Sequence, residues 1–378
     1  MPQSASPASS AGPSPDQPGR RRLDRVIPAL VALCLVLPLV GTLAALYSQT
    51  SASITFTDRE RDGVTYLRPL VRLLSATVDA QSTAVAGTAV DGARLKAASH
   101  DVEAVNAQLG AVLSTTDRWG ELRTRLDQLG GSGGNAQATY RAYSVVIDLE
   151  LALVSRVGDT SNLILDPELD SYYVMDATLL RVPAILTDSG KVASLTGLAE
   201  ASRADADRLA AAVSTSLVRS NMARIDDGLR KSFNATSSRT LASALLTPLD
   251  HLRDNITTFA PPSLEVGATP KTQDRATADL TRTAVRDAAL GFETTGLTEL
   301  DALLAARTAG QVGTQRAVLG SALAGLLLAA GLSVWAARRR AGRRADTPDP
   351  RVDLSFVDSP PGDLVGAGRS GPAAQGRS

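Results

Sequence analysis

The sequence predicts an all-α fold, an elongated antiparallel bundle of four or more long helices held between two transmembrane helices. Aromatic residues make up only 3% of the 378 residues, which argues against a β-sandwich because strands are rich in aromatic and β-branched side chains. Apolar residues recur at helical spacing through the middle of the chain. Two runs without charge, one near each end, are long enough to cross a bilayer as helices.

The first uncharged run covers residues 26–47 and reads VIPALVALCLVLPLVGTLAALY. At 1.5 Å per residue such a helix is about 33 Å long, which is enough for the hydrocarbon core of a bilayer. Before it, residues 1–25 are rich in Pro, Ser and Ala and end in an arginine cluster, and we expect them to be a disordered tail. A cleaved signal peptide is the alternative to a retained span, because the preceding segment is basic.

The second uncharged run covers residues 317–337 and reads AVLGSALAGLLLAAGLSVWAA. Residues 338–378 follow, with an arginine cluster and then a Pro/Gly-rich tail that we expect to be disordered. Arginines therefore flank the outer side of both runs, and the positive-inside rule places both termini in the cytoplasm. We expect a two-pass protein of the plasma membrane with residues 48–316 outside the cytoplasm.

Residues 48–316 read as helices joined by turns. Apolar residues recur at spacings of three and four, which predicts seams that helices bury against one another. The seams are Val64, Leu67, Val71, Leu74 and Val78, then Val102, Val105, Leu109 and Val112, then Trp119, Leu122, Leu126 and Leu129. Gly, Pro and Asn clusters predict turns at residues 87–92, 130–135, 158–166, 188–190, 234–238 and 260–270. We expect the helices next to the two spans to continue into them without a break.

Neither charge nor motifs indicate a nucleic-acid site or an enzyme. Residues 48–316 carry 27 basic and 32 acidic groups, so this segment lacks the positive excess that a nucleic acid requires. The sequence contains none of the phosphate-binding, zinc-protease or serine-hydrolase motifs. Cys34 is the single cysteine, and His100 and His251 stand alone. We therefore predict no catalytic residue, no metal site and no cofactor.

Residues 161–183, SNLILDPELDSYYVMDATLLRVP, hold the densest cluster of polar and aromatic residues in the chain. One interpretation is structural. Asp166 would be the N-cap of a helix and Pro167 its first residue, with further carboxylates in the first turn. The tyrosines would pack in the bundle, and Pro183 would kink or end the helix.

Another interpretation of the same stretch is a pocket for a small ligand between helices. The residues that would line it are Tyr172, Tyr173, Asp176 and Arg181. Arg68 or Arg72 of the first helix would then supply positive charge to an anion. A third interpretation is a surface for a partner protein.

Three stretches of the chain carry a resemblance to a known family. They are ERDGVTYLRPLVRLL at residues 60–74, RWGELRTRLDQL at residues 118–129, and SNLILDPELDSYYVMD from Ser161 onward. In this order they resemble the extracytoplasmic sensor regions of bacterial methyl-accepting chemotaxis proteins and related sensor histidine kinases. The resemblance covers residues 50–186 and implies a helical sensor domain that transmits a signal through the membrane.

Receptors of this family continue after the second span into a HAMP relay and an output domain, which residues 338–378 do not resemble. The resemblance therefore implies signalling through a separate kinase or chemotaxis output protein. We also expect a homodimer through the bundle and the second span, where Gly320 and Ala324 would allow close helix approach. The alternatives are a structural or scaffolding membrane protein without a small-molecule ligand, and a receptor sequence that is cut short.

Overall fold

The structure is a computed structural model that describes residues 20–129, 135–203, 205–261 and 275–345. Over these residues the chain forms helices and turns and contains no strand, which confirms the all-α prediction. The chain divides into two compact units, Met1–Ser321 and Ala322–Ser378. The bundle belongs to the first unit.

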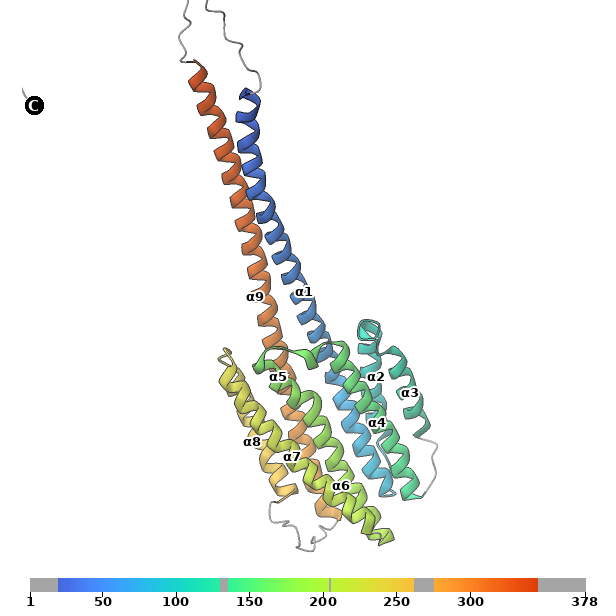
Figure 1. Ribbon diagram of the computed structural model, residues 1–378. Coiled ribbons are helices and arrows are strands. Elements are labelled where there is room, and N and C mark those ends of the chain that lie inside the picture. Colours follow the sequence, from blue (N-terminus) through green and yellow to red (C-terminus); the bar gives the residue numbers. More distant parts are fainter. Residues whose placement is uncertain (1–19, 130–134, 204, 262–274, 346–378) are drawn as a thin grey trace, which may run out of the picture. The chain divides into compact units, whose positions relative to one another are not determined.

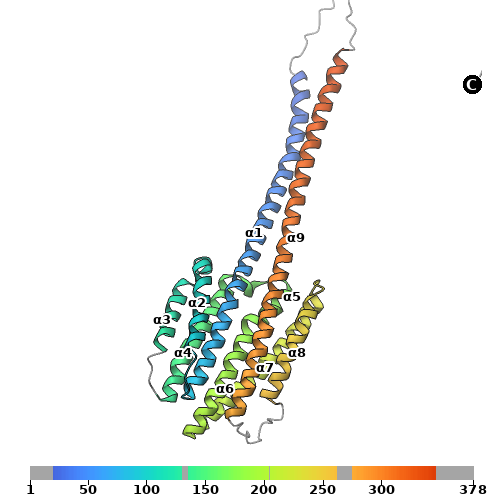
Figure 2. The ribbon, with the colours of Figure 1, turned by 180° about the vertical axis from the view of Figure 1, so that it is seen from behind.

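Two very long helices carry the predicted spans at their outer ends. They are α1 (Arg20–Val85) and α9 (Arg275–Ala345). Each is one uninterrupted helix, which confirms that the bundle helices continue into the predicted spans. Within the first unit α1 and α9 lie side by side in both views (Figures 1 and 2).

The first group of helices follows the predicted seams. It contains α2 (Gly92–Leu109) and α4 (Ala136–Thr160), which pack on α1, and α3 (Thr116–Leu129), which packs on α4 and α2. The whole seam of α1 from Val64 to Val78 is buried. The seam prediction is wrong at Val112, which is exposed. The reason is that α2 ends at Leu109 and the chain turns before α3, so the neighbouring Leu113 takes the buried position.

The stretch 161–183 forms the junction between α4 and the next helices. It contains the 3₁₀ turn η1 (Leu163–Leu165), α5 (Leu169–Met175) and the π-helical segment η2 (Asp176–Arg181), which leads into α6 (Val182–Ser202). Pro183 lies in the first turn of α6, where the lack of an N–H costs little. At the predicted kink or stop the chain therefore stays helical. The turn before Pro183 is π-helical, and the residues after it continue as α6.

The second group of helices completes the bundle. It consists of α6, α7 (Asp205–Ala235), α8 (Leu241–Phe259) and the bundle part of α9. α8 buries an apolar face at spacings of three and four, made of Leu241, Leu245, Leu249, Leu252, Ile256 and Phe259. The predicted turns at 87–92 and 234–238 are confirmed. Most residues of the two turns predicted at 130–135 and 260–270 lie outside the described residues.

The turn predicted at residues 188–190 is wrong, because α6 runs through it and is buried along most of its length. Gly190 serves close packing instead of chain reversal. A Cβ atom built on Gly190 would lie 2.1 Å from Cγ1 of Val78 on α1. The missing side chain lets α6 approach α1 at this point.

We expect Gly190→Ala to destabilise the full chain by about 1–3 kcal/mol, because the stiff, β-branched Val78 cannot move aside. The measurement is urea unfolding in detergent. Gly291→Ala is the matched control, since it lies in α9 with nothing within 4 Å of a built Cβ. It should be neutral or slightly stabilising, because Ala favours a helix more than Gly does. Equal effects of the two substitutions would contradict the close approach of α6 to α1.

Among the described residues, one helical stretch, Asp279–Trp335, is long and apolar enough to cross a membrane by length and composition. Its apolar side chains beyond residue 318 are exposed: Leu319, Leu323, Leu326, Leu327, Leu328, Leu332, Val334 and Trp335. A helix that is apolar on all sides is expected to lie in apolar surroundings. In the first predicted span the side chains of residues 26–33 and 35 lie outside the description, and the large apolar side chains of Leu37, Leu39, Val40, Leu46 and Tyr47 are exposed.

Candidate functional site

Polar side chains join α1 to α9 at five levels, which we call the interhelical ladder. The levels are Ser51 with Gln315, Glu60 with Arg307, Arg61 with Asp301, Arg68 with Leu297 and Thr298, and Asp79 with Arg282 and Arg286. The residue numbers rise on α1 as they fall on α9. The two helices therefore run antiparallel in one register along about 42 Å of α1.

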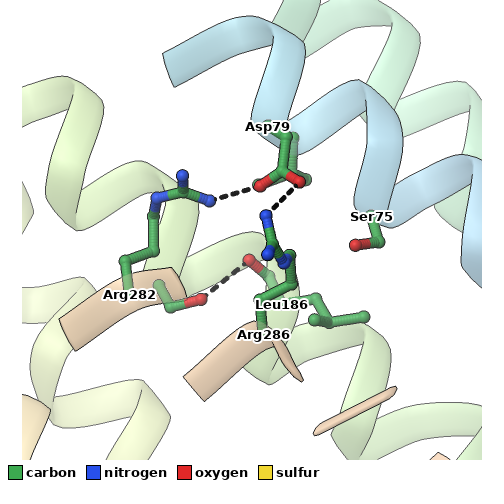
Figure 3. Close-up of a pocket in the computed structure, with 7 residues that line it drawn as sticks. Ser75, Asp79, Leu186, Arg282 and Arg286 are labelled. Carbon is green, nitrogen blue, oxygen red and sulfur yellow. Dashed lines mark hydrogen bonds and ion pairs between the residues drawn. The ribbon is translucent and has the colours of Figure 1, made fainter. Parts of the chain in front are cut away.

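Three arginines surround the carboxylate of Asp79, and we call these four residues the Asp79 cluster. Asp79 Oδ1 lies 2.5 Å from Nη1 of Arg282, and Oδ2 lies 2.6 Å from Nη1 of Arg286 and 3.0 Å from Nη1 of Arg94. Figure 3 shows the guanidinium groups of Arg282 and Arg286 converging on the one carboxylate. Their side chains are 9% and 18% exposed. Two largely buried positive charges therefore share one largely buried carboxylate, and Arg286 also bonds the exposed carboxylate of Asp287 at 2.7 Å.

Three members of the Asp79 cluster, Asp79, Arg282 and Arg286, line a small pocket between α1, α6 and α9. Ser75, Val78, Leu186 and Ser189 also line it. The side chains fill it and leave no room for a water molecule. Ser189 Oγ donates to the carbonyl of Leu186 at 3.0 Å. In contrast, the buried Ser75 Oγ and Arg282 Nε have no hydrogen-bond partner among the described residues. The pocket thus holds more donor groups than Asp79 satisfies.

A second cluster, which we call the Glu60 cluster, joins α1 and α9 to the junction before α5. Arg307 of α9 lies at its centre. Nη2 of Arg307 is 3.0 Å from Oδ1 of Asp166 and 2.6 Å from Oγ of Ser171, and Nη1 is 3.5 Å from Oε2 of Glu60. The Glu60 and Asp166 side chains are fully buried. One guanidinium group therefore serves two buried carboxyl groups.

The charge balance of the Glu60 cluster favours a bound proton. Burial, together with the nearby charge of Asp166, raises the pKa of Glu60 to about 8, although Arg307 acts in the opposite direction. Glu60 Oε1 and Asp166 Oδ2 also lack hydrogen-bond partners among the described residues. The cluster can therefore take up or release a proton near neutral pH.

Two further glutamates lie in the core of the bundle. Burial raises the pKa of Glu150 on α4 to about 8, although the hydroxyl of Thr77 donates to its Oε1 at 2.7 Å. Burial also raises the pKa of Glu293 on α9 well above its ordinary value, and the charge of Arg68 opposes this shift. Glu150 is therefore expected to be protonated at neutral pH, and burial makes both carboxyl groups expensive to ionise.

The structure places the predicted ligand residues of α1 on the ladder and on the helix itself. Arg68 donates to Thr298 Oγ1 at 3.2 Å and to the carbonyl of Leu297 at 3.1 Å. Arg72 Nε donates to the carbonyl of Arg68 at 3.1 Å. Both arginines therefore make bonds within α1 or to α9.

The predicted ligand residues of the junction contact one another or α7. Asp176 and Arg181 form a two-point ion pair at 2.9 and 3.0 Å. The rings of Tyr172 and Tyr173 meet edge to face at 5.3 Å, and Lys231 of α7 lies 5.3 Å from the ring centre of Tyr173. The pocket of the Asp79 cluster includes none of these residues. The ligand-pocket interpretation stays a prediction.

The predicted helix start at Asp166 and Pro167 needs correction. α5 begins at Leu169, because Glu168 is still extended and its carbonyl accepts the first helical bond, from Tyr172 N–H. Asp166 accepts from the N–H of Glu168 at 3.0 Å in the turn before the helix. Its carboxylate also holds Arg307, a contact 141 residues away in the chain. The ion pair places Asp166 inside the bundle.

The residues of the two clusters are absent from the predicted site. A weak signal exists for the Asp79 cluster, because Arg282 and Arg286 are four residues apart and so share a helix face. No comparable signal links Glu60 to Asp166 and Arg307. Among the described residues, no group of three or more His, Cys, Asp or Glu side chains is placed to hold a metal ion.

Comparison with known proteins adds no relative. The chain matches no protein-family model, and neither a curated protein nor a solved structure matches it.

Proposed function

We propose that this protein is a two-pass protein of the plasma membrane whose extracytoplasmic helical bundle senses a ligand or a partner. The observation that carries the proposal is the interhelical ladder. It ties α1 to α9 in one register, and each of these helices continues into an uncharged run long enough to cross a bilayer. A change in the bundle that moves α9 along α1 would reach the cytoplasmic side through these two helices.

The proposed signal is a small shift between two packed helices, of the kind that known switches use. The ladder suits such a shift because its polar bonds can break and re-form with neighbouring partners. The proposal includes no chemical reaction in the protein itself. The signal would pass to a separate kinase or chemotaxis output protein, and the resemblance of residues 50–186 to chemoreceptor sensor regions supports this part.

The proposed topology places residues 48–316 outside the cytoplasm and both termini inside. The exposed apolar segment of α9 supports the second span. At its end the guanidinium group of Arg339 stacks on the ring of Trp335 at 4.0 Å. An aromatic residue next to arginines is typical of a membrane–water interface on the cytoplasmic side. A homodimer through the bundle and the second span is part of the same proposal.

Cross-linking between α1 and α9 tests the proposed shift. In a Cys34→Ser background, Ser51→Cys and Gln315→Cys replace a pair whose side chains are bonded at 3.0 Å. We expect the rate of disulfide formation in membranes to change with ligand, across a panel of amino acids, organic acids and inorganic anions. The control pair is Gln81→Cys with Ser144→Cys, which joins α1 to α4 and should not respond.

The outcome also separates the sensor from the alternative function. Compounds that raise the melting temperature of the protein bind its folded state. If such compounds leave the Ser51–Gln315 cross-linking rate unchanged, the sensor proposal is wrong. If no compound stabilises the protein, a scaffolding protein without a small-molecule ligand is favoured.

A further inference from the structure

We infer that the Asp79 cluster is an anion-binding site whose resident occupant is the carboxylate of Asp79, and that a free small oxyanion competes for it. The first argument is charge. Arg282 and Arg286 are largely buried, and each donates to one oxygen of the same carboxylate. Arg94 adds a third guanidinium group at 3.0 Å. Arg286 also pairs with Asp287 at 2.7 Å, and Arg282 lies 4.0 Å from Asp279. These two carboxylates are 62% and 45% exposed, so water screens them more than it screens Asp79.

The second argument is the set of donors that Asp79 leaves unused. Ser75 Oγ is buried, lines the pocket and has no hydrogen-bond partner among the described residues. Figure 3 shows it facing the space between Asp79 and Arg286. Arg282 Nε is also buried and without a hydrogen bond, 4.0 Å from Asp279. A carboxylate offers two oxygens, whereas phosphate or sulfate offers more and could satisfy these donors as well.

The third argument is space. The pocket has no room for a water molecule beside Asp79, so an anion can enter only when this side chain leaves. Asp79 is the α1 member of its ladder level, and both partners on α9 are arginines. Exchange of Asp79 for a free anion therefore removes both bonds of this level between α1 and α9, while the arginines stay neutralised. The inference assigns small oxyanions as the ligand class of the proposed sensor. Only the effect of anion binding on signalling rests on the sensor proposal; the binding itself does not.

Asp79→Ala tests the site, because it removes the resident carboxylate and leaves a space of similar size. We expect phosphate or acetate, at constant ionic strength against chloride, to raise the melting temperature of the full-length variant in detergent. Its affinity for these anions should be at least about tenfold higher than that of the wild type, since internal competition is gone. Asp301→Ala is the matched control, because it removes the partner of Arg61 from the same ladder.

An equal response of Asp79→Ala and Asp301→Ala to phosphate and to acetate would overturn the inference. If Asp79→Ala does not fold in any buffer, the wild type and Arg286→Gln decide. If phosphate stabilises the wild type and Arg286→Gln abolishes this stabilisation, the site is supported. If phosphate does not stabilise the wild type, or if the stabilisation persists in Arg286→Gln, the inference is overturned. Phosphate and acetate arms separate inorganic oxyanions from carboxylates. Binding is measured without signalling, so its failure leaves the sensor proposal standing, with a different ligand.

Discussion

Arg307→Ala should destabilise the full chain by about 3–5 kcal/mol at pH 8, because it removes the cation from a buried group of charges. Among the described residues, Arg307 is the cation that contacts both Glu60 and Asp166, whose side chains are fully buried. Two carboxyl groups would then face each other without compensation. Ser171 would also lose its bond to Arg307. Urea unfolding in detergent measures the loss.

The loss caused by Arg307→Ala should shrink as the pH falls. A protonated carboxyl group needs no cation, so acid relieves the variant more than the wild type. The control is Arg61→Ala, which breaks the ion pair with Asp301 in the same ladder. That pair is 40% and 35% exposed, and its removal should cost no more than about 1 kcal/mol at any pH. A loss for Arg307→Ala as small as the control would contradict the buried cluster.

Glu150→Gln should stabilise the protein by about 3 kcal/mol at pH 7. Burial raises the pKa of Glu150 to about 8 in the folded protein, whereas the unfolded chain has an ordinary value near 4.5. At pH 7 the folded protein must therefore bind a proton that the unfolded chain releases, which costs about 1.4 kcal/mol per pH unit above 4.5. Glutamine copies the neutral form, and its oxygen can still accept from Thr77.

The sign of the pH dependence follows from the raised pKa. The folded state binds more protons than the unfolded state between pH 4.5 and 8, so wild-type stability falls as the pH rises through this window. Glu150→Gln should make that slope shallower, and the stabilities of Glu150→Gln and the wild type should converge at pH 4.5. Glu121→Gln, on the exposed face of α3, should change neither stability nor slope. A wild-type stability that rises from pH 5 to 8 would show that these buried glutamates do not control it.

Short-range patterns predicted the helices because burial repeats with the helix period. Val64 to Val78 lie on one face of α1, and that face can be recognised from spacing alone. The prediction that Val112 is buried was wrong because the end of α2 shifts the buried position by one residue. The turn predicted at Gly190 was wrong because glycine occurs both in turns and at close helix contacts, and local sequence does not distinguish these uses.

The two clusters were missed for a different reason. Asp79 meets Arg282 and Arg286, and Asp166 meets Arg307, across more than a hundred residues of chain. Such pairings depend on how the helices are arranged, which the helix period does not encode. The dense polar and aromatic composition of residues 161–183 predicted a site there, and one member of that stretch, Asp166, does belong to a buried cluster. Tyr172, Tyr173, Asp176 and Arg181 make local contacts or contact α7.

The ion pair between Asp176 and Arg181 joins residues five positions apart in η2. In an α-helix the neighbouring side chains are three or four positions apart, whereas the π-helix brings residues i and i+5 together. The pair therefore reports the winding of the backbone. If this turn were rewound as an α-helix, the two side chains would separate. The distance between positions 176 and 181, measured by spectroscopy or by cross-linking, would therefore show which winding the chain adopts.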